Sequence, residues 1–336
     1  MFEDKVILVT GGTGSIGSEL VRQLLKYNPK AIRIFSRGEE KQFYMQQQLA
    51  AYDNVRFLIG DVRDYQRVEY ASRGVDIIFH AAAMKHVPAS EYNPMEAVKT
   101  NVNGTQNVIE AAISNNVEKF VAISTDKVVN PSTTMGATKL LMERIVIAAN
   151  QYKGKTKTVF SCVRFGNVMG SSGSVIPLFC KQIEKNLDLT LTHKDMTRFM
   201  MSIPQAVELV LDAAKNSTYG ETYVLKMPSI KISTIAEYMI EDYNREHTDA
   251  YKGEIKITGI RPGEKLYEEL MTTNEIERSF ESDSMYIIPP LFHADAREYE
   301  KYEPVKITSY SSNTKDLMTK DELMDVIKEN KIIQWN

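Results

Sequence analysis

The residues best suited to acid and base chemistry stand together at Ser124-Thr125-Asp126-Lys127. A carboxylate and an amine follow the apolar stretch 119–123 directly, and such a pair can give and take protons. Lys139 follows in a helix expected from about 135 to 150, four residues after Met135 and therefore on the same helical face. The alternative is that Asp126 and Lys127 form a surface ion pair.

In nucleotide-binding α/β sheets the catalytic groups lie beyond the carboxyl ends of the strands, where this cluster falls. We therefore predict an α/β fold, a Rossmann-type doubly wound parallel sheet with a smaller C-terminal substrate-binding lobe. Residues 1–168 would form the dinucleotide-binding domain, with later segments returning to it. Residues 169–290 would form mainly the substrate-binding lobe, and 291–336 a C-terminal extension to which we assign only a helix near 320–330.

The composition favours small-molecule chemistry. The 336 residues are 43% hydrophobic, which is enough for a large core, and the net charge of −3 comes without long runs of one sign. We therefore expect no nucleic-acid partner and no membrane association. With no leader-like N-terminus and only Cys162 and Cys180, both expected to be buried free thiols, we predict a cytoplasmic protein. We predict no metal site.

The first predicted strand, residues 5–10, runs into Gly11-Gly-Thr-Gly-Ser-Ile-Gly17. Glycines at this spacing between a strand and a helix permit a tight turn and close approach of the backbone to a pyrophosphate, which then lies at the helix N-terminus. The alternative is a plain glycine-rich turn. The second strand, 31–35, ends at Ser36-Arg37 instead of an acidic residue, and an arginine there favours NADP over NAD. Arg37 is otherwise an ordinary solvated charge.

Later strand ends offer further contacts for a nucleotide. Asp61 and Val62 follow the third strand, and Ala81-Ala82-Ala83 follow His80 at the end of the fourth. Small residues there suit close passage of the cofactor, although they also suit helix packing. We interpret His80 as a core histidine. Lys85 and His86 face either a substrate or solvent, and a helix from about 94 to 115 carries Asn101.

Several motifs together resemble the extended short-chain dehydrogenase/reductase family, within it the bacterial UDP-N-acetylglucosamine 4,6-dehydratases of polysaccharide and nonulosonic-acid biosynthesis. The resemblance covers roughly residues 1–290. Its main motifs are the glycine-rich turn, Ala81-Ala-Ala-Met-Lys-His-Val-Pro88, Ser124-Thr-Asp-Lys127, Met135-Gly-Ala-Thr-Lys139, Arg164-Phe-Gly-Asn-Val168 and Arg261-Pro-Gly-Glu-Lys265.

The resemblance implies oxidation at C4 of the sugar, elimination of water across C5 and C6, and return of the hydride to C6. By position Asp126 would be the acid at C6 and Lys127 the base at C5. A cationic nicotinamide and Lys139 nearby would lower the pKa of Lys127, as a general base requires. Lys139 would hydrogen-bond the nicotinamide ribose.

Met135 departs from the wider family, in which most members carry a tyrosine that takes the proton from the hydroxyl being oxidised. A thioether cannot do this. Some members of the dehydratase subgroup resemble this sequence in carrying Met there, so the base for the C4 hydroxyl is left open between Lys127 and Asp126 acting through Thr125.

The expected site has three parts. The catalytic residues are Thr125, Asp126, Lys127 and Lys139. The cofactor, NADP or alternatively NAD, would contact Gly11, Thr13, Gly14, Ser15, Ile16, Gly17, Ser36, Arg37, Lys41, Asp61, Val62, Ala81, Ala82, Lys85, Asn101 and Lys139. UDP-N-acetylglucosamine or a close UDP-sugar would contact Lys85, His86, Asn167, Val175, Arg198, Arg261 and Glu264.

Two other functions remain open at this point. One is a UDP-N-acetylhexosamine epimerase, which shares the cofactor fold and similar motifs. The other is an NADP-binding regulator that has lost catalysis, which Met135 favours and the intact Asp126, Lys127 and Lys139 disfavour. The resemblance also implies a homo-oligomer. It does not determine the C5 configuration of the product.

Overall fold

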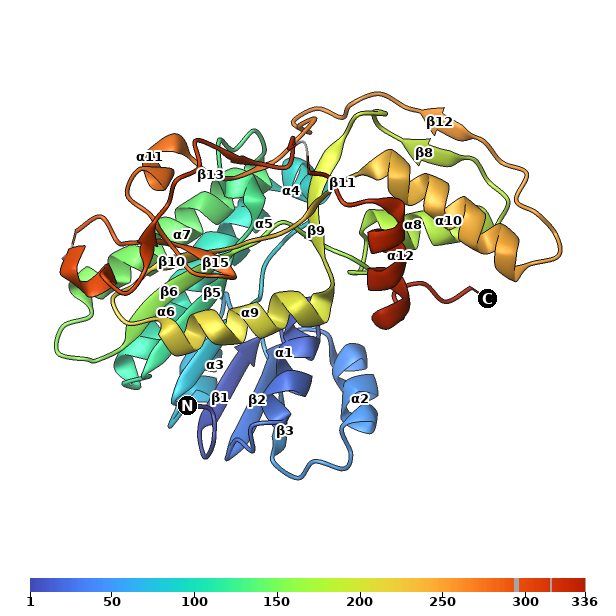
Figure 1. The fold of residues 1–336 in the computed structure, drawn as a ribbon. Helices are drawn as coiled ribbons and strands as arrows, with labels where there is room; N and C mark the ends of the chain where they lie inside the picture. The colour runs from blue at the N-terminus through green and yellow to red at the C-terminus, as the bar shows by residue number, and fades with distance from the viewer. Residues whose placement is uncertain (293–295, 315, 336) are drawn as a thin grey trace.

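A sheet of ten strands forms the centre of the molecule in the computed structural model, which describes residues 1–292, 296–314 and 316–335 (Figure 1). The strand order is β16-β14-β15-β10-β6-β5-β4-β1-β2-β3. Seven strands are parallel: β3 (Val55–Ile59), β2 (Ala31–Ser36), β1 (Val6–Thr10), β4 (Ile77–His80), β5 (Lys119–Ile123), β6 (Val159–Arg164) and β10 (Thr222–Leu225). Three antiparallel strands extend one edge: β15 (Met285–Ile288), β14 (Phe280–Glu281) and β16 (Glu303–Pro304).

Helices cover both faces of this sheet, which confirms the doubly wound α/β prediction. In β1, Ile7 and Val9 pack into one core and Leu8 into the other, because both faces of the strand are buried. The first face carries α1 (Ser15–Leu25), α2 (Glu39–Gln48) and α9 (Ile203–Asn216). The opposite face carries α3 (Tyr65–Ser72), α6 (Gly104–Ser114) and α7 (Thr134–Tyr152).

A smaller lobe follows β6 in the chain and is drawn on the right of Figure 1. Its core is a separate apolar cluster that includes Phe179, Ile235 and Leu323. The helices of the lobe are α8 (Val175–Glu184), α10 (Ile232–Glu246) and α12 (Lys320–Glu329). Its strands are β7 (Asn167–Val168), β9 (Thr197–Met201) and β11 (Ser229–Lys231) in one sheet, and β8 (Leu189–Leu191) with β12 (Ile255–Ile257) in another.

The described residues beyond 290 take part in both halves of the molecule. Strand β16 lies at the edge of the main sheet, and β17 (Tyr310–Ser311) pairs with β13 (Glu269–Met271). Helix α12 packs into the core of the lobe through Leu323 and Ile327. The remaining short helices are α4 (Val87–Tyr92), α5 (Pro94–Ala97) and α11 (Thr273–Ile276).

The helix expected from about 94 to 115 is present as three consecutive helical segments, α5, a π-helical segment Val98–Asn103 and α6, and the buried Asn101 lies in the π-helical segment. One local prediction is wrong. Cys180 is partly exposed, since the buried face of α8 is made by Ile176, Phe179 and Ile183; Cys162 is buried as expected, and both thiols are free. Within the described ranges, no helix combines the length and apolar character needed to cross a bilayer.

Candidate active site

The glycine-rich turn after β1 is packed so tightly that Gly11 and Gly17 leave no room for a side chain. Gly11 has a φ of 69°, and a Cβ on it would lie 2.7 Å from the backbone nitrogen of Ala82. A Cβ on Gly17 would lie 2.3 Å from the Gly11 carbonyl oxygen. Gly14 is the N-cap of α1 and has no side chain, so the N–H groups of the first helical turn are not capped by a side chain. This bare turn and helix N-terminus fit a dinucleotide's pyrophosphate.

The loop after β2 lies beside this turn. Thr13 Oγ1 donates a hydrogen bond of 3.1 Å to Ser36 Oγ. Arg37 is exposed, and its Nη1 lies 3.9 Å from Asp61 Oδ2. Burial would raise the pKa of Asp61, but hydrogen bonds from Arg63 and the charges of Arg63 and Arg37 outweigh it and lower the pKa. The Arg37 side chain is therefore largely exposed, with one long contact to a carboxylate.

The other expected cofactor contacts surround the same turn. Lys41 is exposed near the start of α2. Val62 is buried against α6, where a Cβ on Gly104 would lie 2.7 Å from Val62 Cγ2. Ile16 is partly buried against the core, and Ser15 Oγ accepts a hydrogen bond from a residue of the lobe. Their contacts with a nucleotide stay predictions.

His80 and Asn101 hold the strand ends that frame the turn. The His80 ring is 1% exposed and lies 2.8 Å from Thr10 Oγ1 and 2.9 Å from Thr105 Oγ1, which confirms it as a core histidine. The Asn101 amide accepts from the Met84 N–H at 2.8 Å and donates to the Met84 carbonyl at 3.1 Å. Asn101 therefore fixes the loop that follows β4.

The acid and base pair follows β5 as the sequence suggests. Asp126 is fully buried, and its Oδ1 accepts from Thr125 Oγ1 at 2.8 Å and from Lys127 Nζ at 2.7 Å. The Asp126 N–H donates to the Phe165 carbonyl at 3.1 Å, so β6 fixes its backbone. Asp126 Oδ2 is buried and finds no hydrogen-bond partner in the described part of the chain. A buried carboxylate oxygen without a partner destabilises a fold, so its presence requires an explanation other than stability.

The expected pKa of Lys127 is wrong for the protein alone. Burial would lower it, but the carboxylates of Asp126 and Glu268 outweigh burial and raise the pKa of Lys127. The pKa of Lys139, in contrast, is lowered by burial to about 8. Lys139 Nζ donates to the Ile123 carbonyl at 2.6 Å, so its ammonium is turned to the end of β5. Met135, on the same helix, is buried.

A loop of the lobe joins the nucleotide side of the site. The Ser172 N–H donates to Ser15 Oγ at 3.1 Å, and Lys85 Nζ donates to the Ser172 carbonyl at 2.8 Å. A Cβ on Gly173 would lie 2.5 Å from His86 Cε1. Lys85 and His86 therefore lie where the glycine-rich turn, the loop after β4 and the lobe meet.

Among the expected substrate residues, Arg198 and Glu264 lie close together. Arg198 is buried on β9; its guanidinium donates to the carbonyls of Thr197, Leu266 and Lys265, and lies 3.7 Å from Glu264 Oε1. The structure thus joins Arg198 and Glu264. The Arg261 side chain is exposed, although its backbone N–H donates to Glu264 Oε2 at 3.2 Å.

Asn167 and Val175 complete the expected substrate set. Asn167 lies on β7 and is half-buried, and its Oδ1 is buried without a hydrogen-bond partner among the described residues. Val175 begins α8 and packs against the core of the lobe.

Sequence analysis missed one charged member of this cluster. Glu268 is 3% exposed, and its Oε1 lies 3.9 Å from Lys127 Nζ and 3.9 Å from Arg198 Nε. Burial raises the pKa of Glu268, and the charge of Asp126 raises it further. The charges of Lys127 and Arg198 lower this pKa, but they do not outweigh burial. No motif marks this position, since a glutamate in a charged stretch resembles a surface residue.

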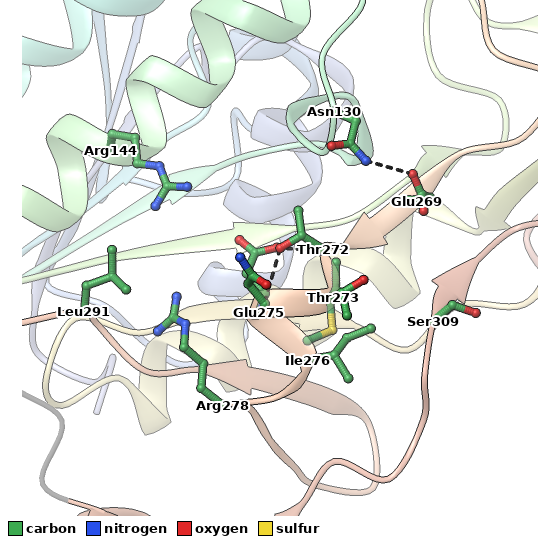
Figure 2. A pocket seen from close by; sticks show the side chains of 12 residues that line it. Asn130, Arg144, Glu269, Thr272, Thr273, Glu275, Ile276, Arg278, Leu291 and Ser309 are labelled. Atoms are coloured by element: carbon green, nitrogen blue, oxygen red, sulfur yellow. Dashed lines mark hydrogen bonds between the residues drawn. The ribbon is translucent and has the colours of Figure 1, made fainter.

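A separate cavity of about 570 Å³ is shown in Figure 2. Arg144 and Arg278 project toward it, and Asn130 Nδ2 donates to Glu269 Oε2 at its rim. Glu275, also on its wall, pairs with the buried Arg164 at 3.0 Å. None of the expected site residues is among the described residues that line this cavity.

Comparison with known proteins gives one family. The family profile described as "Polysaccharide biosynthesis protein" matches residues 7–290. An "uncharacterized membrane protein" of Methanocaldococcus jannaschii is 51% identical over 98% of this chain and 96% of its own. A UDP-N-acetylglucosamine 4,6-dehydratase (inverting) of Campylobacter jejuni is 42% identical over 97% of this chain and 98% of its own.

Two further comparisons bear on activity and fold. A UDP-glucose 4-epimerase of Rickettsia bellii is 44% identical over 90% of this chain and 87% of its own. The X-ray structure of Pen from Bacillus thuringiensis superposes with a TM-score of 0.94 at 44% identity, covering 99% of this chain and all of that one.

Proposed function

The chain belongs to the polysaccharide biosynthesis protein family of extended short-chain dehydrogenases, enzymes that dehydrate or epimerise nucleotide sugars, and we propose that it is an NADP-dependent UDP-N-acetylglucosamine 4,6-dehydratase. The product would be a UDP-4-keto-6-deoxy-N-acetylhexosamine. The observation that carries the proposal is the pair formed by Asp126 and Lys127, a fully buried carboxylate in direct contact with an ammonium. Elimination of water needs an acid and a base side by side, whereas epimerisation at C4 does not.

The cofactor would lie on the glycine-rich turn, with Arg37 near its 2′-phosphate and Lys139 near its ribose. When bound, NADP would supply the hydride chemistry, accepting a hydride from C4 of the sugar and returning it at C6. Arg198, Glu264 and the free amide oxygen of Asn167 would hold the UDP-sugar, because an arginine fork pairs well with diphosphate oxygens.

Thr125 and Asp126 provide a route for the proton that leaves the C4 hydroxyl. Met135 cannot accept it. Thr125 Oγ1, which donates to Asp126 Oδ1 at 2.8 Å, would accept that proton while passing its own to Asp126. Asp126 is then a carboxylic acid and can protonate the departing C6 hydroxyl, which leaves as water.

Lys127 acts at C5 in the same step. Once Asp126 is protonated, Lys127 loses the closer of its two carboxylate neighbours, and its ammonium can release a proton more easily. The proton released by the ammonium goes to solvent, and the resulting amine takes the C5 proton as the C6–O bond breaks and later returns it to C5. A proton from solvent then restores the Lys127 ammonium beside the Asp126 carboxylate. Over one turnover the sugar loses one water and both side chains regain their starting states.

The proposal is tested by incubating the protein with UDP-N-acetylglucosamine and NADP and following the product by mass spectrometry for loss of one water. The NMR spectrum of the product formed in heavy water then gives the C5 configuration. A product of unchanged mass that is a hexosamine epimer would overturn the proposal in favour of the second candidate, the epimerase that the R. bellii relative suggests.

The roles of the two side chains are tested by a matched pair of variants. Lys127→Ala should lose roughly 10²-fold or more in turnover, the scale of a missing general base, while still folding and binding NADP. Met135→Ala should cost far less, because it removes only packing. If Lys127→Ala still exchanges the C5 hydrogen with heavy water at the original rate, the base lies elsewhere.

A further inference from the structure

Glu268 is a carboxylate that the proposed reaction does not use, yet it stands beside the acid and base pair. It precedes β13, far along the chain from Asp126 and Lys127. Its side chain is almost completely buried, and its Oε1 lies 3.9 Å from Lys127 Nζ. Lys127 therefore has a carboxylate from a second segment within reach, in addition to its neighbour Asp126.

The other oxygen of Glu268 argues that the residue is not there for stability. Glu268 Oε2 is buried and has no hydrogen-bond partner among the residues that the structure describes. An unsatisfied buried carboxylate oxygen destabilises a fold. The closest cations, Lys127 and Arg198, lie at 3.9 Å, which is beyond hydrogen-bonding distance, so Glu268 acts on both through its charge.

We propose that Glu268 is a positioning residue of the catalytic cluster that, together with Asp126, sets the protonation state of Lys127. Its part in catalysis rests on the proposed function, because it acts through the C5 base. Its effect on Lys127 follows from the contacts alone.

The charges around Lys127 come from three segments. Asp126 adjoins it in sequence, Arg198 approaches from β9, and Glu268 and Lys265 approach from the stretch before β13. Lys265 Nζ is bound to the Val129 carbonyl at 2.8 Å, and Glu264 lies 3.7 Å from the Arg198 guanidinium. Removing the Glu268 charge leaves Lys127 with one carboxylate neighbour.

The neighbouring Glu269 provides a matched control. Its side chain points the other way along the strand, toward the cavity of Figure 2, where it accepts a hydrogen bond from Asn130 at 3.1 Å. Glu269→Gln removes the same charge one residue away from Glu268 without removing a neighbour of Lys127.

The experiment measures the titration of the Lys127 amine directly and needs no substrate. The side chain of Lys127 is 26% exposed, so trace acetylation at a series of pH values, read by mass spectrometry of its peptide, gives its midpoint. We expect the midpoint in Glu268→Gln to fall by about one pH unit or more, since an opposite charge this close has effects of that order. Glu269→Gln should leave it unchanged.

An unchanged Lys127 midpoint in folded Glu268→Gln would overturn the inference, whatever the substrate is. If that variant does not fold, Glu268→Asp, which keeps the charge but withdraws it by one methylene, should lower the midpoint by a smaller amount, and no change there would likewise overturn it. With substrate, the acid limb of kcat should move to lower pH in Glu268→Gln while KM is retained. Failure of the unmodified protein to dehydrate UDP-N-acetylglucosamine would overturn the proposed function instead, and the acetylation result would still decide the inference.

Discussion

The buried histidine at the end of β4 makes the stability of the protein depend on pH. Burial, with a smaller contribution from the charge of Lys139, lowers the pKa of His80 to about 3, against an ordinary value of 6.5. The folded protein therefore keeps His80 neutral at pH values where the unfolded chain protonates it. The stability from this site is fully present above about pH 6.5 and is lost progressively as the pH falls toward about 3.

The size of the effect follows from these two pKa values. Each pH unit between them costs about 1.4 kcal/mol, so the free energy of unfolding falls by about 2 kcal/mol between pH 6.5 and about pH 5. Over the whole interval the loss is about 5 kcal/mol. The contacts explain why the proton is excluded: His80 is 1% exposed, and its ring lies between the hydroxyls of Thr10 and Thr105, which carry no charge.

The variant His80→Gln isolates this contribution, because glutamine also donates and accepts hydrogen bonds but does not titrate. Urea unfolding of both proteins at about pH 7.5 and about pH 5 gives their difference in free energy at each pH, in which other titrating groups cancel. We expect the unmodified protein to lose about 2 kcal/mol more than the variant on acidification. A difference that stays constant would show that His80 takes up its proton in the folded state and would refute the reasoning.

Two further predictions concern the cofactor and the fold. Replacement of Arg37 by Asp should reverse a preference for NADP over NAD, since a charge-assisted contact contributes roughly 1.5 to 3 kcal/mol and a like charge adds repulsion. The affinities for both cofactors are measured by titration. Equal affinities in the unmodified protein would contradict this prediction. Replacement of Arg164 by Met should cost about 3 to 5 kcal/mol of stability, because it strands the buried carboxylates of Glu143 and Glu275, 2.7 Å and 3.0 Å from the guanidinium. A loss of stability below about 1 kcal/mol, measured by urea unfolding, would contradict this prediction.

The parts of the fold that the sequence predicted are those governed by neighbours in the chain. The continuous apolar run of β1 and the glycines after it specify a buried strand, a tight turn and a helix within about twenty residues. The π-helical segment at 98–103 was not predicted, and the amide of Asn101 within it binds the backbone of Met84, which lies 17 residues earlier in the chain. Apolar periodicity alone does not reveal such a contact.

The same distinction applies to the two lysines of the site. Their positions in the sequence place both near the end of β5, but the direction of each ammonium depends on packing. Lys139 turns to the Ile123 carbonyl, whereas Lys127 turns to Asp126 and Glu268. Burial and the charge of Arg198 lower the pKa of Lys127, but the carboxylates of Asp126 and Glu268 outweigh them and raise it. In the mechanism that we propose, Lys127 therefore becomes a base only after the carboxylates around it change.

The C-terminal segment, whose role the sequence left open, holds this charged cluster together. Ser312 is fully buried; its Oγ accepts from the Glu268 N–H at 2.9 Å, and its own N–H donates to the Glu268 carbonyl at 2.8 Å. The Ser312 hydroxyl also lies 3.1 Å from that of Thr197, the residue before Arg198. One serine thus joins the backbones that carry Glu268 and Arg198, the two residues that face Lys127 from outside its own segment. The distance between these charges is consequently set by a residue 44 positions beyond Glu268. Motifs confined to the first 290 residues therefore predict the pair of Asp126 and Lys127 but not how the charges around Lys127 are held.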